Sequence, residues 1–298
     1  MKVEILAHIF LATSIIVGVL AGLAFAWAQE PSTAELDGWR IEYETGGTGD
    51  DALVFIHGAT SSRKAFYPQM ADLDIGRRLL AVDLIGHGGS DKPETAYTMA
   101  LFARSVAAAM DAEGIRCATL VAHSNGVPVA REFYRMYPER TEAIVAVDGA
   151  FQNPLPPEMV EWMRAAFDRP DFDDFRAGMA DMMPTFALSE DDLAMIKADM
   201  LATPRHVMVG ELESMTDPSI WRDDKIEVPL LVLLAQQPTW TPERIDYIRE
   251  IGPHIEYHMW EGVSHFMALE RRDEFNALLA EFVDRLPGCR ASLPPFRY

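Results

Sequence analysis

The stretch Thr119–Gly126 (TLVAHSNG) constrains the fold more than any other part of the chain. It predicts a short buried strand that runs directly into Ser124, and the helix-forming run from Val127 to Tyr137 follows at once. Such a strand-to-helix turn is so sharp that the positions two residues before and after the serine must carry almost no side chain. Here they are Ala122 and Gly126, and alanine is a small variant of the more usual glycine. We therefore expect an exposed serine hydroxyl at the end of a strand, near the positive end of a helix.

Strand-like and helical segments alternate through most of the chain. Besides the strand before Ser124, the expected strands are 39–44, 52–56, 79–82, 143–147, 230–234 and 255–259; the expected helices are 101–113, 127–137, 242–251 and 272–286. This order predicts an α/β fold with a doubly wound, mostly parallel sheet covered by helices on both faces. Ligands of such folds bind at the carboxyl ends of the strands.

One segment, residues 153–224, breaks the alternation. Prolines punctuate its start, and several short helical patterns rich in methionine follow. We expect a helical cap inserted between two strands, so that residues 38–152 and 225–288 form the core. Methionine adapts to irregular apolar spaces, and we expect most of these side chains to pack the interior of the cap and a minority to line a pocket: Met159, Met163, Met179, Met182, Met183, Met195, Met200 and Met208.

The first 28 residues are expected to lie outside the fold. Lys2 precedes an apolar run from about Ile5 to Trp27, and small residues at 26 and 28 fit cleavage before Gln29. This pattern predicts a signal peptide of an exported, periplasmic or secreted protein. The run is nearly long enough to span a bilayer, so an uncleaved N-terminal membrane anchor is the alternative.

Export would permit a disulfide between the two cysteines of the chain. Cys117 opens the strand that leads to Ser124, and Cys289 follows the last expected helix, at the start of a tail of residues 289–298. Strand starts and the ends of the following helices share one edge of a doubly wound sheet, which makes the pairing geometrically compatible. The alternative is one buried thiol and one thiol in a loose tail.

Length, composition and charge limit the kinds of partner that the chain can bind. With 298 residues and 49% hydrophobic content it can bury a large core. Its formal charge of −20 argues against nucleic acid, because phosphate binding needs clustered lysine and arginine, and equally against anionic lipid headgroups. The scattered histidines lack the spacing of a metal site, so neither a metal nor another cofactor is expected, and contact with a membrane is expected only through an uncleaved N-terminal segment.

Four motifs in order resemble the α/β-hydrolase superfamily, specifically its serine hydrolases with a helical cap. They are His57-Gly58-Ala59-Thr60, the stretch from Asp83 to Ser90, the turn from Ala122 to Gly126, and Gly262-Val263-Ser264-His265-Phe266. The resemblance covers roughly residues 38–286. It implies the superfamily's fold and a Ser-acid-His triad in which Ser124 is the nucleophile.

The resemblance also implies a base and an oxyanion hole. His265 lies between the last strand and the last helix, where the superfamily places the histidine that takes the serine proton. The backbone N–H groups of Asn125, directly after the serine, and of Ala59 would bind the developing negative charge. Three other histidines lie near these motifs. We expect His57 to be structural and His87 to brace the glycine-rich loop. We expect His123 to lie beside the nucleophile and its pocket.

The acid is the least regular member of the triad. In most of the superfamily it follows the strand here at 230–234, but the loop after that strand carries no carboxylate near Pro238. Glu243 and Asp246 come late, on the next expected helix. Some members carry the acid after the preceding strand, where this chain has Asp148. We therefore expect Asp148 to orient His265, with a carboxylate near Glu243 or in the cap as the alternative.

These residues predict an exported serine esterase that cleaves small to medium apolar carboxylic esters through an acyl-Ser124 intermediate. A serine at this turn disfavours dehalogenase and epoxide-hydrolase chemistry, which need a carboxylate nucleophile. A lactonase or carbon–carbon bond hydrolase could use the same triad, and a perhydrolase or haloperoxidase side activity would need peroxide. The loop without an acid keeps open a further alternative, a binding module without catalysis.

Overall fold

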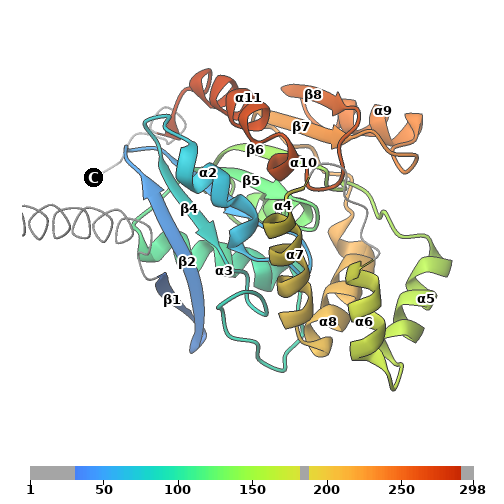
Figure 1. The fold of residues 1–298 in the computed structure, drawn as a ribbon. Helices are drawn as coiled ribbons and strands as arrows, with labels where there is room; N and C mark the ends of the chain where they lie inside the picture. Colours follow the sequence, from blue (N-terminus) through green and yellow to red (C-terminus); the bar gives the residue numbers. More distant parts are fainter. Residues whose placement is uncertain (1–30, 182–187, 290–298) are drawn as a thin grey trace, which may run out of the picture. The chain divides into compact units, whose positions relative to one another are not determined.

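The computed structural model describes residues 31–181 and 188–289 (Figure 1). The expected signal peptide or anchor and residues 290–298 of the expected tail lie outside these ranges. Within them, no helix is both long and apolar enough to cross a membrane.

An eight-stranded sheet forms the centre of the fold, with strand order β1-β2-β4-β3-β5-β6-β7-β8. β2 pairs antiparallel with β4, and the strands from β4 to β8 pair in parallel. This confirms the doubly wound, mostly parallel α/β sheet. The strands are β1 (Ser32–Leu36), β2 (Trp39–Gly47), β3 (Ala52–Ile56), β4 (Arg78–Val82), β5 (Ala118–His123), β6 (Thr141–Val147), β7 (Leu230–Ala235) and β8 (Ile255–Trp260).

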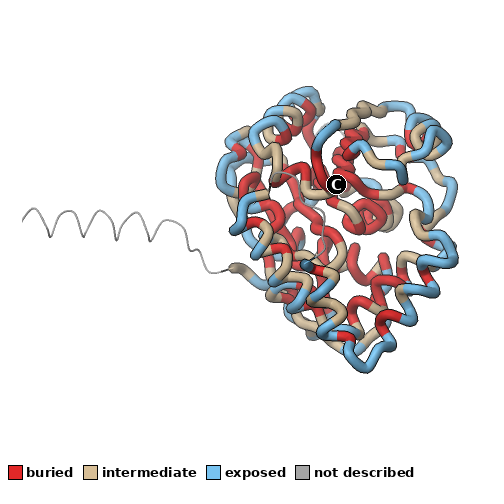
Figure 2. Tube along the Cα trace, turned by 45° about the vertical axis from the view of Figure 1, so that its right-hand side comes forward, coloured by how far each residue is buried: buried red, intermediate tan, exposed pale blue. Residues whose placement is uncertain are grey.

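Helices cover both faces of the sheet, because the central strands are apolar on both sides (Figures 1 and 2). On one face Val54 of β3 shares a buried cluster with Phe102 and Phe133, and on the other Phe55 shares one with Phe275. Burying side chains of this size stabilises by roughly 1.5–3 kcal/mol each. The helices of the first face are α3 (Met99–Ala112) and α4 (Gly126–Met136); those of the second are α2 (Tyr67–Asp72), α10 (Met267–Glu270) and α11 (Arg272–Asp284).

The sheet begins earlier than the expected core boundary at residue 38. β1 forms a hairpin with β2, and the two residues that join them, Asp37 and Gly38, have φ values of 56° and 88°. Positive φ at both central positions is typical of the hairpin turn that an Asp-Gly pair favours. The strand β1 is absent from the strands expected from the sequence, although the Asp-Gly pair is a sequence signal for its turn.

Among the described residues between β6 and β7, several helices occur, as expected for an inserted cap: α5 (Pro157–Phe167), α6 (Phe172–Asp181), α7 (Glu190–Ala202), α8 (Arg205–Thr216) and the 3-10 helix η4 (Pro218–Ile220). Phe167, Phe172, Met208 and Leu212 form a separate apolar cluster against which Met163 packs. The precise cap boundaries at 153 and 224 stay a prediction, and Met182 and Met183 lie outside the described residues. The remaining elements are η2 (Arg63–Phe66), η3 (Pro138–Arg140) and α9 (Pro242–Glu250).

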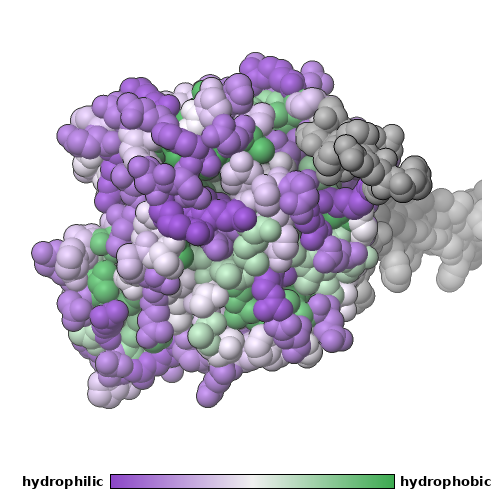
Figure 3. Space-filling view, turned by 180° about the vertical axis from the view of Figure 1, so that it is seen from behind, coloured by the Kyte–Doolittle hydropathy of each residue, from purple (hydrophilic) through white to green (hydrophobic). Residues whose placement is uncertain are grey.

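Hydrophilic side chains cover much of the surface seen in Figure 3, and apolar residues form smaller patches between them. This agrees with a sequence in which charged residues make up 24%.

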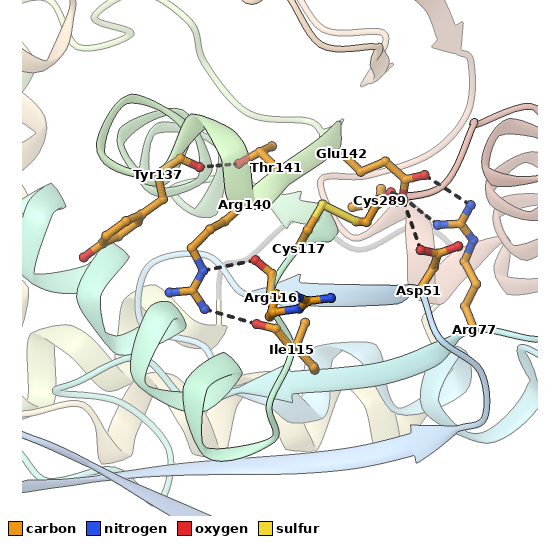
Figure 4. Close-up of a disulfide and its surroundings, with 11 residues drawn as sticks. Asp51, Arg77, Ile115, Arg116, Cys117, Tyr137, Arg140, Thr141, Glu142 and Cys289 are labelled. Atoms are coloured by element: carbon orange, nitrogen blue, oxygen red, sulfur yellow. Dashed lines mark hydrogen bonds and ion pairs between the residues drawn. A yellow bond between two sulfur atoms is a disulfide. The ribbon is translucent and has the colours of Figure 1, made fainter. Parts of the chain in front are cut away.

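A disulfide joins Cys117 to Cys289 across 172 residues of sequence, with a Cα–Cα distance of 5.8 Å (Figure 4). It ties the start of β5 to the segment after α11. The backbone N–H of Cys289 also donates to Asp51 Oδ1 at 3.0 Å, and the residue is buried. The expected pairing is confirmed, and the alternative of a loose tail thiol is wrong. A bridge that closes so long a loop stabilises by about 2–5 kcal/mol.

Candidate active site

Ser124 sits in a strained backbone conformation between β5 and α4. Its φ is +54°, a region that costs a non-glycine residue free energy unless the surroundings impose it. Its backbone N–H donates to Val147 O at 2.9 Å. At Gly126 a Cβ would lie only 2.4 Å from Ile56 O, so this position admits no side chain. Ala122 is fully buried within β5. The turn thus presents the serine at the carboxyl end of a central strand.

His265 and Asp148 meet at the same end of the sheet. Asp148 follows β6 with φ +45°, and His265 lies between β8 and α10. His265 Nδ1 donates to Asp148 Oδ2 at 2.6 Å. The carboxylate is nearly buried, whereas 39% of the imidazole side chain stays accessible. An imidazole held through Nδ1 keeps Nε2 free to accept a proton. Of the three carboxylates weighed from the sequence, Asp148 is the one that the structure brings to His265.

The loop after β7 supports Asp148. The backbone N–H of Ala235 and the indole Nε1–H of Trp240 donate to Oδ1 at 3.0 and 3.1 Å, and Gln237 Nε2 lies 3.4 Å from Oδ2. A buried carboxylate is costly unless donors surround it. This loop, which carries no acid, therefore supplies donors to the acid on the neighbouring strand.

A cavity of about 440 Å³ opens over these groups, and Ser124, Asp148 and His265 all line it. Its walls are largely apolar side chains of the cap and of the segment that leads into it. They are Pro154, Leu155, Pro156, Met159, Met215 and Trp221. One methionine expected in the cap, Met159, lines the cavity, as does Met215, which was not singled out from the sequence. The site is thus sized for a small, mostly apolar molecule.

The loop after β3 lies against the serine. A Cβ on Gly58 would stand 2.8 Å from the Cβ of Ser124 and 3.3 Å from its Oγ. Ala59 follows Gly58 in this loop, and Asn125 follows Ser124 as the N-cap of α4. Backbone N–H groups in such positions can stabilise an oxyanion.

Two buried histidines are held neutral. Burial lowers the pKa of His57 to about 4, and its Nε2 accepts the N–H of Leu84 at 3.0 Å. Burial, aided by the neighbouring His265, lowers the pKa of His123 to about 3. His123 Nε2 lies 2.8 Å from His265 O, so it holds the loop that carries His265. It does not contribute to the cavity wall, contrary to the expectation that it might.

His87 differs from these two, because a carboxylate of the cap reaches it. Burial disfavours its imidazolium, but Glu211 Oε1 of α8, 3.2 Å from Nε2, together with Ile85 O and Asp83, offsets this and raises the pKa above 6.5. Its Nδ1 lies 3.2 Å from Ile85 O, which braces the glycine-rich loop as expected. Asn125 Nδ2 also lies 3.4 Å from Glu211 Oε1. Glu211 thus links the cap to the residue that follows Ser124.

Asp83, at the start of the glycine-rich motif, is fully buried and structural. It forms an ion pair with Arg63, and the backbone N–H of Gly89 donates to its Oδ2 at 2.8 Å. The motif is therefore a folded loop that supports the strand ends around the site.

Sequence reasoning missed Glu211, Gln237, Trp240 and Arg244, all of which contact or line this site. They stand in a cap helix or after β7, and only the tertiary fold brings them to the serine. In the described part of the chain, no group of three or more histidine, cysteine or acidic side chains is placed to hold a metal ion.

Comparison with known proteins agrees with this architecture. Residues 53–278 match the model of the alpha/beta hydrolase family. The chain is 26% identical over 261 residues to a 2-hydroxy-6-oxononadienedioate/2-hydroxy-6-oxononatrienedioate hydrolase of Paraburkholderia phymatum, which covers 82% of this chain and 91% of that protein.

Solved structures give the same picture. Est816, described as an N-acyl homoserine lactone degrading enzyme, has a TM-score of 0.69 at 26% identity and covers 84% of this chain and 100% of its own. A thermophilic esterase from Thermogutta terrifontis has a TM-score of 0.72 at 21% identity. The match covers 86% of this chain and 99% of the esterase. At the latter identity the likeness shows the fold alone.

We predict that Asp148→Asn lowers kcat by about 10³–10⁴-fold, because the amide cannot hold the imidazole in its tautomer or stabilise the imidazolium. The measurements are ester turnover and the rate at which a fluorophosphonate probe labels the protein. Glu243→Gln and Asp246→Asn remove the two rejected carboxylates on α9 and serve as controls with near-wild-type rates. Near-wild-type turnover in a folded Asp148→Asn protein would show that Asp148 is not the acid.

We also predict that the His87–Glu211 pair makes unfolding free energy depend on pH. Because the folded pKa of His87 is raised above 6.5, its contribution is fully present below pH 6.5 and is lost as pH rises through the folded pKa. The lowered pKa values of His57 and His123 act in the other direction. The unfolded chain takes up their protons below pH 6.5, so each costs about 1.4 kcal/mol per pH unit as pH falls toward 4.

Urea unfolding from pH 5 to 8.5 separates the two effects. Glu211→Gln should remove the loss above pH 6.5 and deepen the loss below it, because burial then disfavours the His87 imidazolium without a carboxylate to offset it. Glu213→Gln, an exposed position on the same helix, should keep the wild-type profile. Parallel profiles for wild type and Glu211→Gln would contradict the assignment.

Proposed function

Because the chain belongs to the alpha/beta hydrolase family, we propose that it is an exported serine hydrolase that cleaves carboxylic esters of small to medium apolar substrates. The observation that carries the proposal is the 2.6 Å bond from His265 Nδ1 to Asp148 Oδ2, on the wall of the cavity that Ser124 also lines. Serine, imidazole and carboxylate in this order form the machinery of acyl transfer.

In the proposed reaction, His265 Nε2 takes the proton of Ser124 as Oγ attacks the ester carbonyl. The tetrahedral intermediate collapses, the imidazolium protonates the leaving alcohol, and an acyl-Ser124 ester remains. Water, deprotonated by the same imidazole, then attacks this ester and releases the acid. Asp148 stays ionised and stabilises the imidazolium in both halves.

Charge on the carbonyl oxygen would be stabilised by the backbone N–H groups of Ala59 and Asn125. The close approach of Gly58 to Ser124 supports this role, because it brings the backbone of the loop after β3 against the serine side chain. Removing one such donor typically costs 10²–10³-fold in turnover.

Hydrolysis of a carbon–carbon bond is the second candidate, and the curated relatives favour it. Three 2-hydroxy-6-oxononadienedioate/2-hydroxy-6-oxononatrienedioate hydrolases match more than four-fifths of the chain, at 24–26% identity. The same serine and histidine would serve, but the leaving group would be a carbanion that needs a proton on carbon. Lactone hydrolysis, the activity named for Est816, differs only in that the leaving alcohol stays attached to the acyl group.

We predict that a fluorophosphonate probe forms an adduct on Ser124, located by mass mapping, and that p-nitrophenyl esters give a burst of p-nitrophenol as the acyl-enzyme accumulates. Ser124→Ala should abolish both. Ser219→Ala, which removes an exposed hydroxyl far from the turn in sequence, is the matched control and should label like wild type.

A substrate panel separates the candidates. The ester proposal expects the highest kcat/KM on p-nitrophenyl esters, the second candidate expects it on 2-hydroxy-6-oxo-dienoic acids, and a lactonase expects it on acyl lactones. A folded protein that forms no adduct and turns over none of them would favour the binding-module alternative.

The proposal includes export, which the Cys117–Cys289 disulfide supports, because such bonds persist mainly outside the reducing cytosol. When the full chain is expressed in a bacterium with a secretion system, the mature protein should begin at Gln29 and contain no free thiol. A protein that keeps residues 1–28 and fractionates with membranes would support the anchor instead, and a cytosolic protein with two free thiols would contradict export.

A further inference from the structure

Arg244 is the cationic side chain in the wall of the cavity that holds Ser124. It stands in the first turn of α9, close to Trp240 and Thr239, which line the same cavity. The residues around it are apolar, polar but uncharged, or the Asp148 carboxylate that already accepts from His265. The ester hydrolysis proposed above gives this positive charge no role, because that reaction needs only serine, imidazole, carboxylate and two backbone N–H groups.

The Arg244 guanidinium also makes few interactions with the described part of the protein. In the parts of the chain that the structure describes, most arginines have a carboxylate within 4.0 Å, but Arg244 does not. Arg244 makes one hydrogen bond, from Nη2 to the carbonyl oxygen of Asn153 at 3.3 Å. A guanidinium carries five N–H donors in a planar fork. In a chain with 46 acidic residues, an arginine at the site without an acidic partner is open to an anion from outside.

The bond to Asn153 places the guanidinium beside the segment that leads into the cap. Asn153 directly precedes Pro154 and Leu155, which form part of the cavity wall. Arg244 is half-buried, so solvent screens its charge less than that of an exposed arginine. The planar fork matches a carboxylate in two parallel hydrogen bonds, a geometry that lysine cannot provide.

We propose that Arg244 is a specificity-determining residue that binds a carboxylate group of the substrate, so that the enzyme prefers esters with a carboxylate at the far end of the molecule to neutral esters of the same shape. The proposal rests on the ester hydrolase function above and specifies its substrate class. It predicts a substrate with an apolar middle, held between the reacting carbonyl at Ser124 and the anion at Arg244.

The test compares mono-p-nitrophenyl adipate with p-nitrophenyl 6-methylheptanoate, in which an isopropyl group replaces the carboxylate. The wild type should favour the adipate, and Arg244→Gln should lower the ratio of the two kcat/KM values by roughly 10–100-fold, the worth of a hydrogen-bonded charge pair, mainly through KM. Arg244→Lys should keep part of the ratio. Arg249→Gln removes the same charge from the same helix, at an exposed residue outside the cavity wall, and should keep the wild-type ratio.

A purely structural arginine gives a different result. If Arg244 served only to hold the Asn153 carbonyl, its loss would slow both esters by the same factor and leave the ratio unchanged. An unchanged ratio in Arg244→Gln therefore overturns the proposal and leaves the ester hydrolase function intact.

A binding measurement distinguishes failure of the carboxylate site from failure of the ester hydrolase function. Calorimetry of adipic acid monoanilide with Ser124→Ala needs no turnover, and adding Arg244→Gln should weaken Kd by roughly 10–100-fold. If no ester is hydrolysed but this loss of affinity is seen, the ester function fails and the carboxylate site stands. If esters are hydrolysed and affinity does not depend on Arg244, the carboxylate site fails alone.

Discussion

The buried Asp148 carboxylate is the constraint on which the arrangement of the site depends. A negative charge at the end of β6 is tolerable only if donors surround it, and these donors come from two separate segments, residues 235–240 and His265. Ala235 and Trp240 fix the path of the loop after β7, and His265 fixes the loop after β8. The carboxylate therefore sets the relative positions of two loops as well as the orientation of one imidazole.

The position of the acid changes what the loop after β7 can do. A loop that carried the acid itself would have to direct that carboxylate toward the imidazole. Here Gln237 and Trp240 face Asp148 and also line the cavity, and the chain then enters α9 with Arg244 in its first turn. Placing the acid on β6 thus leaves the β7 side of the cavity to side chains that contact substrate and set its selection.

The features that could be predicted from the sequence are those that depend on local sequence patterns. The strand-turn-helix around Ser124, the parallel sheet and the helices between β6 and β7 followed from periodicity, small residues and order along the chain. The sequence permitted the Cys117–Cys289 bridge but did not decide between it and two free thiols. β1 was missed although the Asp37–Gly38 pair signalled its turn. Contacts such as Glu211 with His87 were not predictable, because a glutamate on a cap helix carries no local mark of its partner more than a hundred residues away.

Burial decides which histidine can act as a base. His57 and His123 lie close to the serine in sequence or space, but the low dielectric around them disfavours the imidazolium, and their nitrogens are engaged by backbone groups. His265 combines an accessible ring with a hydrogen bond from Nδ1 to Asp148, which leaves Nε2 to accept a proton. His123 also supports the base directly. Its contact with the carbonyl oxygen of His265 holds the loop that presents the His265 imidazole to the cavity.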